Sequence, residues 1–172
     1  MKNIVIIGFM ATGKSTVGRY LAQRLKRPFI DTDKEIEAVT GKTVAQIFAR
    51  DGEKRFRSEE NLLVKKLVLK KGLIIATGGG MVLNPENFRL LKENGIMIAL
   101  TAAPDIIYQR VKGKRDRPLL AKGDLRENIK TVLQEREGIY QEADLTVDTG
   151  ICSANEAVEQ IISYLEERKS LG

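Results

Sequence analysis

The chain has 172 residues, a length that suits one compact domain with a sizeable core. Its net charge of +6 and its pI near 9.4 favour anionic partners such as phosphates, carboxylates, nucleic acids or acidic membrane surfaces. The lack of histidine and the single cysteine, Cys152, exclude Ser-His triads, phosphohistidine relays, His-ligated zinc and an internal disulfide. Proton transfer must therefore use carboxylates, lysine or water.

Aromatic residues make up 5% of the chain and tryptophan is absent, so stacking platforms for single-stranded nucleic acid are scarce. We therefore expect small anions, and no nucleic acid, as partners. Only the short apolar run from Ile4 to Ile7 precedes the first glycine, which is too short for a secretory segment or a membrane span. We expect a cytoplasmic protein with no membrane partner.

Five short apolar runs predict buried strands, and segments with a period near 3.6 residues predict helices between them. The strands are expected at 3–7, 28–30, 73–76, 96–100 and 145–147. The helices are expected at about 14–25, 34–49, 53–71, 85–93, 104–112, 124–141 and 154–168. Strands that alternate with helices indicate a parallel sheet covered on both faces. We therefore predict a single α/β domain over 1–172, with a five-stranded parallel sheet in a three-layer α/β/α arrangement.

The first predicted strand leads directly into a glycine-framed loop. Its sequence is Gly8-Phe9-Met10-Ala11-Thr12-Gly13-Lys14-Ser15-Thr16. In this Walker A pattern the backbone N–H groups point at phosphate oxygens, the lysine reaches the β- and γ-phosphates, and the serine hydroxyl binds Mg²⁺. The helix expected at 14–25 adds the partial positive charge of its N-terminus. The loop predicts a nucleoside triphosphate site.

Two carboxylates, Asp31 and Asp33, follow the second predicted strand, at the sheet edge where ligands bind in such folds. In an extended segment, residues two apart point the same way, so one carboxylate can approach a hydrated metal while the other meets an acceptor. Asp33 also stands where it can cap a helix that begins at Lys34. Capping and catalysis are compatible, and both interpretations stay open.

Arg57 and Glu60 lie three residues apart on a predicted helix, so they share one face and can pair. A guanidinium oriented in this way binds a carboxylate with two hydrogen bonds. The alternative is a surface ion pair worth under about 1 kcal/mol. Phe48 and Phe56 are expected in the core.

Three glycines, Gly78, Gly79 and Gly80, follow the third predicted strand. They expose backbone amides without side-chain obstruction, which suits close approach of a ligand. The alternative is a sharp exit from the strand into a loop, which glycine also favours.

A basic segment bracketed by glycines follows the helix expected at 104–112. Residues 112–123 lack helical periodicity and concentrate lysine and arginine. An isolated charge run is usually a solvated loop, but here the phosphate site gives the cations a partner. We therefore predict a mobile basic lid over about 112–123.

With these motifs in place, nearly the whole chain resembles the shikimate kinases, a family of the nucleoside-monophosphate-kinase-like group of P-loop phosphotransferases. The likeness depends on the order and spacing of its motifs. These are the phosphate loop with Lys14-Ser15-Thr16, Asp31-Thr32-Asp33, Phe56-Arg57 with Glu60, Gly78-Gly79-Gly80, Arg117-Pro118-Leu119-Leu120, and Arg136 four residues before Tyr140.

The resemblance implies transfer of the γ-phosphoryl group of ATP to the 3-hydroxyl of shikimate, with Mg²⁺, on the route to chorismate and the aromatic amino acids. Asp33 is similar to the residue that binds the acceptor hydroxyls, where it either accepts the proton or orients the hydroxyl. Arg57 and Arg136 correspond to the clamp on the acceptor carboxylate. Gly79 and Gly80 correspond to glycines that contact the acceptor, Gly79 through its amide.

On the nucleotide side, the resemblance implies that Lys14 and the lid arginine, Arg117, act on the transferred phosphoryl group. Arg110 is similar to an arginine near the adenine, and Ser15 with Asp31, the latter through water, would hold Mg²⁺. The remaining residues expected to bind ATP are those of the loop, Gly8, Ala11, Thr12, Gly13 and Thr16. After the last strand the chain departs from some members, because 148–153 contains no arginine or proline to flank adenine.

Two other functions remain open at this point. A kinase of the same fold that acts on gluconate or a nucleoside monophosphate shares the phosphate loop, although the charges here suit a small polyhydroxy acid. A nucleotide-switched binding module would use the basic lid to grip nucleic acid, but it would not require the arginines and the glycine run. We expect a monomer with shikimate and ATP as its ligands.

Overall fold

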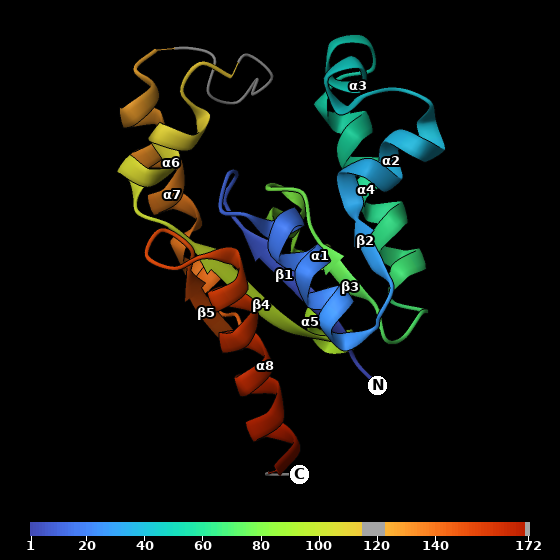
Figure 1. Cartoon of the computed structure of the whole chain (residues 1–172). Helices are drawn as coiled ribbons and strands as arrows, with labels where there is room; N and C mark the ends of the chain where they lie inside the picture. The colour runs from blue at the N-terminus through green and yellow to red at the C-terminus, as the bar shows by residue number, and fades with distance from the viewer. Residues whose placement is uncertain (115–122, 171–172) are drawn as a thin grey trace.

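The sheet of the computed structural model, which describes residues 1–114 and 123–170, consists of five parallel strands in the order β2-β3-β1-β4-β5 (Figure 1). The strands are β1 (Asn3–Gly8), β2 (Phe29–Asp31), β3 (Ile74–Ala76), β4 (Gly95–Thr101) and β5 (Leu145–Asp148). They confirm all five predicted strands to within one residue at each end. β1 is central and pairs along its length with β4 and over Ile4–Ile6 with β3.

Helices cover both faces of the sheet. They are α1 (Lys14–Leu25), α2 (Thr32–Thr40), α3 (Val44–Arg50), α4 (Glu53–Leu67), α5 (Pro85–Asn94), α6 (Pro104–Val111), α7 (Leu125–Gln141) and α8 (Ala154–Ser170), with a 3₁₀ turn, η1 (Met81–Leu83). The phosphate loop after β1 lies between two groups of helices, α6 with α7 on one side and α2 to α4 on the other (Figure 1).

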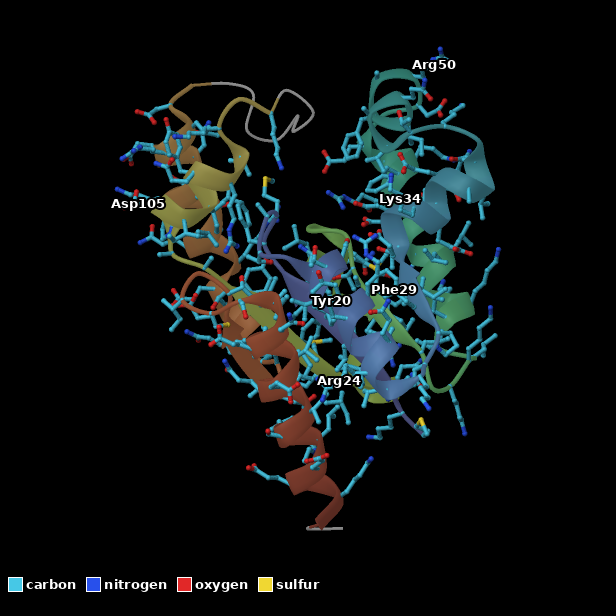
Figure 2. The ribbon with its side chains drawn as sticks, viewed as in Figure 1. Tyr20, Arg24, Phe29, Lys34, Arg50 and Asp105 are labelled. Carbon is cyan, nitrogen blue, oxygen red and sulfur yellow. The ribbon has the colours of Figure 1, made fainter. Side chains whose placement is uncertain are left out.

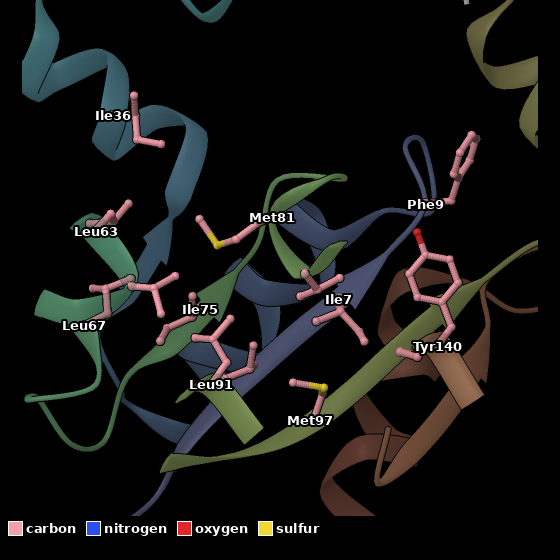
Figure 3. Packing of buried hydrophobic residues seen from close by; sticks show 14 of the residues in the cluster. Ile7, Phe9, Ile36, Leu63, Leu67, Ile75, Met81, Leu91, Met97 and Tyr140 are labelled. Atoms are coloured by element: carbon pink, nitrogen blue, oxygen red, sulfur yellow. The ribbon is translucent and has the colours of Figure 1, made fainter. Parts of the chain in front are cut away.

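The side chains of β1 alternate between two separate cores, because successive residues of a strand point to opposite faces. Ile4 and Ile6 pack with residues of α1 and α8. Val5 and Ile7 pack on the other face with residues of α4, α5 and α7. Figure 3 shows part of this second core, in which Ile7 lies among side chains from β3, η1, α5 and β4. The three-layer α/β/α arrangement is confirmed.

Helix boundaries differ from the prediction in two places. The helix expected at 34–49 is two helices, because Gly41 adopts the left-handed conformation with φ 68° and ends α2. Thr43 then caps α3 in a reciprocal pair of hydrogen bonds with Gln46. The helix expected at 53–71 ends at Leu67. Its apolar periodicity continues past that point, but the backbone turns there toward β3.

Three further expectations concern the aromatic pair, the basic lid and membrane spans. Phe56 is buried in the core, and its ring centroid lies 4.9 Å from that of Phe48. Most of the segment predicted as a lid, 115–122, lies outside the described residues, and so does Arg117. Within the described residues, no helix combines the length and apolar character that crossing a membrane requires.

Candidate active site

The phosphate loop connects β1 to α1 through backbone conformations that its sequence permits. Gly8 has φ 150°, and a Cβ atom there would lie 2.4 Å from the carbonyl oxygen of Leu100. Gly13, with φ 91°, ends the loop and precedes α1. The Lys14 Nζ donates hydrogen bonds of 2.9 Å to the carbonyl oxygens of Gly8 and Phe9. The ammonium group is thus held against the loop that would surround the phosphates.

A second loop, at the end of β5, supports the phosphate loop from the side. The Thr149 hydroxyl donates to the Thr12 carbonyl at 2.6 Å, and the Thr12 hydroxyl donates to the Phe9 carbonyl at 2.7 Å. Arg110, on α6, donates to the Ala11 carbonyl at 2.8 Å and to the Thr149 carbonyl at 2.7 Å. The guanidinium therefore ties the two loops together.

These two loops border a cavity of about 500 Å³. Its walls come from the phosphate loop, α1, α6 and the start of α8, and its lining residues include Gly13, Thr16, Arg110, Lys114, Cys152 and Ser153. The cavity adjoins the phosphate loop and is large enough for a nucleoside. No arginine or proline from 148–153 lines it. Arg110 thus lines the cavity that adjoins the phosphate loop.

A smaller cavity of about 260 Å³ lies on the other side of the phosphate loop. Its lining joins the loop to α2 and to the glycine run, through Lys14, Ser15, Thr16, Asp33, Gly78 and Gly79 among others. Residues far apart in the sequence therefore meet at the carboxyl ends of β1, β2 and β3, as expected for this class of sheet.

Ser15 and Asp31 provide neighbouring oxygen ligands near this cavity. The Ser15 hydroxyl donates to the Asp31 Oδ2 at 2.6 Å. Mg²⁺ usually takes one or two protein oxygens and completes its shell with water and phosphate oxygens. Within the described residues, no three His, Cys, Asp or Glu side chains gather as a metal cage, which Mg²⁺ bound to a nucleotide does not need. The residues fit this ion.

The capping prediction for Asp33 is wrong. Asp31 is the capping residue, because its Oδ1 accepts hydrogen bonds from the backbone N–H groups of Asp33 and Lys34 at 3.1 and 3.3 Å. The extended geometry assumed through Asp33 is wrong as well, since α2 already begins at Thr32. Asp33 thus stands in the first helical turn, where its side chain lines the smaller cavity.

Two arginines flank the glycine run. Arg136, 7% exposed on α7, donates to the Gly79 carbonyl at 3.2 Å, and its guanidinium lies 5.5 Å from the ring centroid of Phe9. Arg57 lies against the next glycine, since a Cβ atom at Gly80 would be 2.6 Å from both of its Nη atoms. Two guanidinium groups at successive glycines have the charge and the hydrogen-bond donors to bind a small anion.

The glycine run does more than expose amides. The Gly78 amide donates to the Thr32 hydroxyl at 2.8 Å, so it is already used within the protein. A Cβ atom at Gly78 would lie 2.5 Å from Asp33 Oδ1 and 3.4 Å from Glu60 Oε2. Glycine is therefore required here because two carboxylates close around the backbone.

Glu60 is buried in the site, and the alternative of a surface ion pair is wrong. Its side chain is 0% exposed, and its Oε1 accepts a hydrogen bond from Arg57 Nη1 at 2.6 Å. Its Oε2 is buried and accepts no hydrogen bond from the described residues. Burial raises the pKa of Glu60 to about 7 against the opposing effect of Arg57, and the charges of Asp33 and Glu53 raise it further.

Sequence reasoning missed three residues that build the site. Thr149 holds the phosphate loop, Thr32 takes the Gly78 amide, and Phe9 packs under Arg136. For Thr149 a usable signal was present, because it follows a predicted strand at the edge where ligands bind. The roles of Thr32 and Phe9 depend on contacts with residues far away in the sequence, so no local sequence pattern indicates them.

Comparisons with known proteins agree with this geometry. The family model for shikimate kinase matches residues 10–166. A shikimate kinase of Pelotomaculum thermopropionicum is 70% identical over 167 residues, which cover 97% of each chain. A shikimate kinase of Desulforudis audaxviator is 54% identical over 168 residues, with 98% of this chain and 88% of that chain covered. The solved structure of shikimate kinase from Acinetobacter baumannii in complex with shikimate has a TM-score of 0.93 at 35% identity, over 98% of this chain and 95% of that one.

The phosphate loop, the parallel sheet and the acidic and basic groups at its carboxyl edge define a P-loop phosphotransferase. Its acceptor is given by the matching family model and by the relatives above. The chain belongs to the shikimate kinase family, and it transfers a phosphoryl group from ATP to a hydroxyl group of shikimate. A gluconate kinase, a nucleoside monophosphate kinase and a binding module are no longer needed as explanations.

Proposed function

We propose that the described cavities are the two halves of the active site, with ATP at the phosphate loop and shikimate between Asp33 and the two arginines. The observation that carries this proposal is the convergence of α1, α2 and the glycine run on one cavity that contains both Lys14 and Asp33. The γ-phosphoryl group of ATP and the 3-hydroxyl of shikimate would meet there. Phosphoryl transfer requires in-line positioning and neutralisation of negative charge, which these groups supply.

On the nucleotide side, the loop residues Gly8, Ala11, Thr12, Gly13, Ser15 and Thr16 would enclose the phosphates, and Lys14 would reach the transferred group. Ser15 and Asp31 would hold Mg²⁺, Asp31 through water. The ion would neutralise phosphate charge and fix the geometry of the phosphate oxygens. The hydrogen bond between Ser15 and Asp31 supports this assignment, because it brings both oxygens to one point.

On the acceptor side, Arg57 and Arg136 would bind the shikimate carboxylate beside Gly79 and Gly80. Asp33 would accept a hydrogen bond from the reacting hydroxyl and either take its proton or orient it. A loose transition state makes little demand on base strength, so orientation alone suffices for catalysis. Arg117 would bring its charge to the phosphoryl group from the lid, a role supported by the motif Arg117-Pro118-Leu119-Leu120.

We further propose that the chain acts as one domain and as a monomer in the cytoplasm. Both sides of the site come from one chain, and the three layers share one sheet, which supports the single domain. The residues that line the two cavities all come from one copy of the chain, which supports the monomer.

The arginine clamp provides the test of this arrangement. We expect Arg57→Ala and Arg136→Ala each to raise the KM for shikimate by roughly 10- to 100-fold, because a charge-assisted hydrogen bond is worth about 1.5–3 kcal/mol. The KM for ATP should change little, since neither arginine lines the nucleotide cavity. Steady-state rates of ADP release with varied shikimate and varied ATP give both constants.

Arg55→Ala is the matched control, because Arg55 lies on the same helix as Arg57, is exposed, and pairs with Glu59. Its KM for shikimate should equal that of the parent enzyme. An unchanged KM for shikimate in both clamp variants would refute the assignment.

A further inference from the structure

The carboxyl group of Glu60 is enclosed by the acceptor half of the site without belonging to the set of groups that the reaction requires. Of its two oxygens, Oε1 holds Arg57 and Oε2 is directed toward Gly78, near Asp33 Oδ1. Oε2 is buried and accepts no hydrogen bond within the described part of the chain. An ionised carboxylate in such a position lacks compensation for half of its charge, and a protonated one does not.

The charges around Glu60 come from several elements. Arg57 and Glu53 act on it from α4, and Asp33 acts on it from α2. Arg136 of α7 approaches only the far end of the glycine run. Other charged groups of the elements packed on α4 face elsewhere. Glu86 of α5 contacts Asn61 and Lys65, while Lys34 of α2 and Arg50 of α3 lie at the exposed surface (Figure 2). Arg57 is thus the guanidinium that acts on both Glu60 and Glu53, and the carboxylate of Asp33 lies close to Glu60 as well.

Shikimate brings a further carboxylate to the same guanidinium. If Arg57 binds it, Glu60 loses part of the positive charge that favours its ionised form and gains an anionic neighbour. Both changes favour protonation of Glu60. The negative charge arriving with the substrate is then offset by a proton taken from solvent.

We propose that Glu60 takes up a proton when the carboxylate of shikimate binds to Arg57, and that it is the positioning residue which releases the guanidinium to the substrate. Between pH 4.5 and 7 the free enzyme already holds much of this proton, and above pH 7 it must be acquired on binding. Binding of shikimate therefore weakens as the pH rises above 7, by up to about tenfold for each pH unit. This inference rests on the proposed contact between Arg57 and shikimate.

The composition of the chain makes the proton measurable. It has no histidine, so few of its groups titrate near neutral pH. The carboxylate of shikimate ionises at far lower pH. The terminal amino group of Met1 lies at the opposite end of β1 from the site, and burial raises the pKa of the Cys152 thiol in the nucleotide cavity above its ordinary value.

Titration calorimetry with shikimate at pH 7.5, in two buffers of different ionisation enthalpy, measures the proton directly. We expect the parent enzyme to take up between about half and one proton per site. Glu60→Gln keeps the oxygen that accepts the hydrogen bond from Arg57, but its side chain cannot titrate. This variant should take up no proton on binding shikimate, and its Kd for shikimate should not change from pH 6.5 to 8.5. Glu60→Asp should restore proton uptake.

Glu53→Gln is the control, because Glu53 pairs with the same guanidinium at 3.4 Å but is 58% exposed. Because the charge of Glu53 raises the pKa of Glu60, the Glu53→Gln variant should take up at least as much proton on binding shikimate as the parent does. The absence of uptake in the parent, together with normal phosphorylation of shikimate, would overturn the proposal and leave the proposed function intact. Equal uptake in Glu60→Gln and the parent would also overturn it.

Discussion

At the scale of single residues, burial converts a common helical ion pair into an unusual one. Arg57 and Glu60 have the spacing of any helical pair, and their neighbours Arg55 and Glu59 form such a pair at the surface. The difference is that Glu60 is fully buried and has one oxygen without a hydrogen bond among the described residues. The charge-assisted bond to Arg57 therefore stands beside a substantial desolvation cost.

This cost gives a stability prediction with a definite sign. The folded chain raises the pKa of Glu60 from 4.5 to about 7, so the stability that this group contributes is fully present below pH 4.5 and is lost as the pH rises to 7. Glu60→Gln should therefore gain free energy of unfolding relative to the parent, by up to about 3 kcal/mol between pH 4.5 and 8.

Urea unfolding at the two pH values measures this difference. In Glu53→Gln, which removes an exposed carboxylate from the same helix, the change should stay within about 0.5 kcal/mol. A difference between Glu60→Gln and the parent that is the same at both pH values would contradict the burial of an ionised group.

At the scale of secondary-structure elements, α1 is fitted closely to β2. Gly18 lies inside α1, and a Cβ atom there would be 2.5 Å from the ring of Phe29. Tyr20 and Arg24 face outward on the same helix, where Arg24 pairs with Glu159 of α8 (Figure 2). The phosphate loop is thereby joined to a helix whose position is fixed on both sides.

Two glycine-to-alanine substitutions, compared with each other, measure how closely α1 packs against β2. Gly138, inside α7, has open space at its Cβ position, so Gly138→Ala should gain about 1 kcal/mol of stability from helix propensity alone. Gly18→Ala has the same gain but forces α1 away from Phe29, which costs roughly 1–3 kcal/mol. We expect a net loss for Gly18→Ala, measured as the free energy of urea unfolding. Equal gains in both variants would show that the contact with Phe29 yields easily.

The link from α6 to the phosphate loop and to the loop after β5 also belongs to this scale. Arg110→Ala removes hydrogen bonds to Ala11 and Thr149, so we expect the KM for ATP to rise by about tenfold or more while the KM for shikimate stays within about twofold. Steady-state kinetics with each substrate varied in turn measures both. Arg89→Ala, at an exposed position on α5, is the control. A larger effect on shikimate than on ATP would contradict the link.

At the scale of the whole molecule, local sequence patterns predicted those features that a short segment determines by itself. The phosphate loop and the strands were predictable because glycine spacing and runs such as Ile4 to Ile7 are local features. The break between α2 and α3 was missed, although Gly41 marks it, because the apolar periodicity runs through it. The capping role given to Asp33 failed for a related reason, since it depends on the residue at which α2 begins.

Local sequence patterns did not predict which side chains are buried, or which residues far apart in the sequence contact each other. Arg57 and Glu60 had the same sequence signature as a surface pair, and only the packing of α4 against α2 and the glycine run places Glu60 inside. The tie from Thr149 to Thr12 spans 137 residues. Such contacts follow from the topology of the sheet, which has to be known first.

The hydrogen bond from Thr149 to the phosphate loop also bears on how the protein is made. The phosphate loop leaves the ribosome well before its support at the end of β5, because Thr149 follows Thr12 by 137 residues. The central strand β1 also forms its pairings late, because its partner β3 follows α1 to α4 in the chain and its partner β4 follows α5. Until β5 has emerged, the phosphate loop of a nascent chain therefore lacks the hydrogen bond from Thr149. ATP can stabilise the finished protein, but it cannot serve as a template for its early folding.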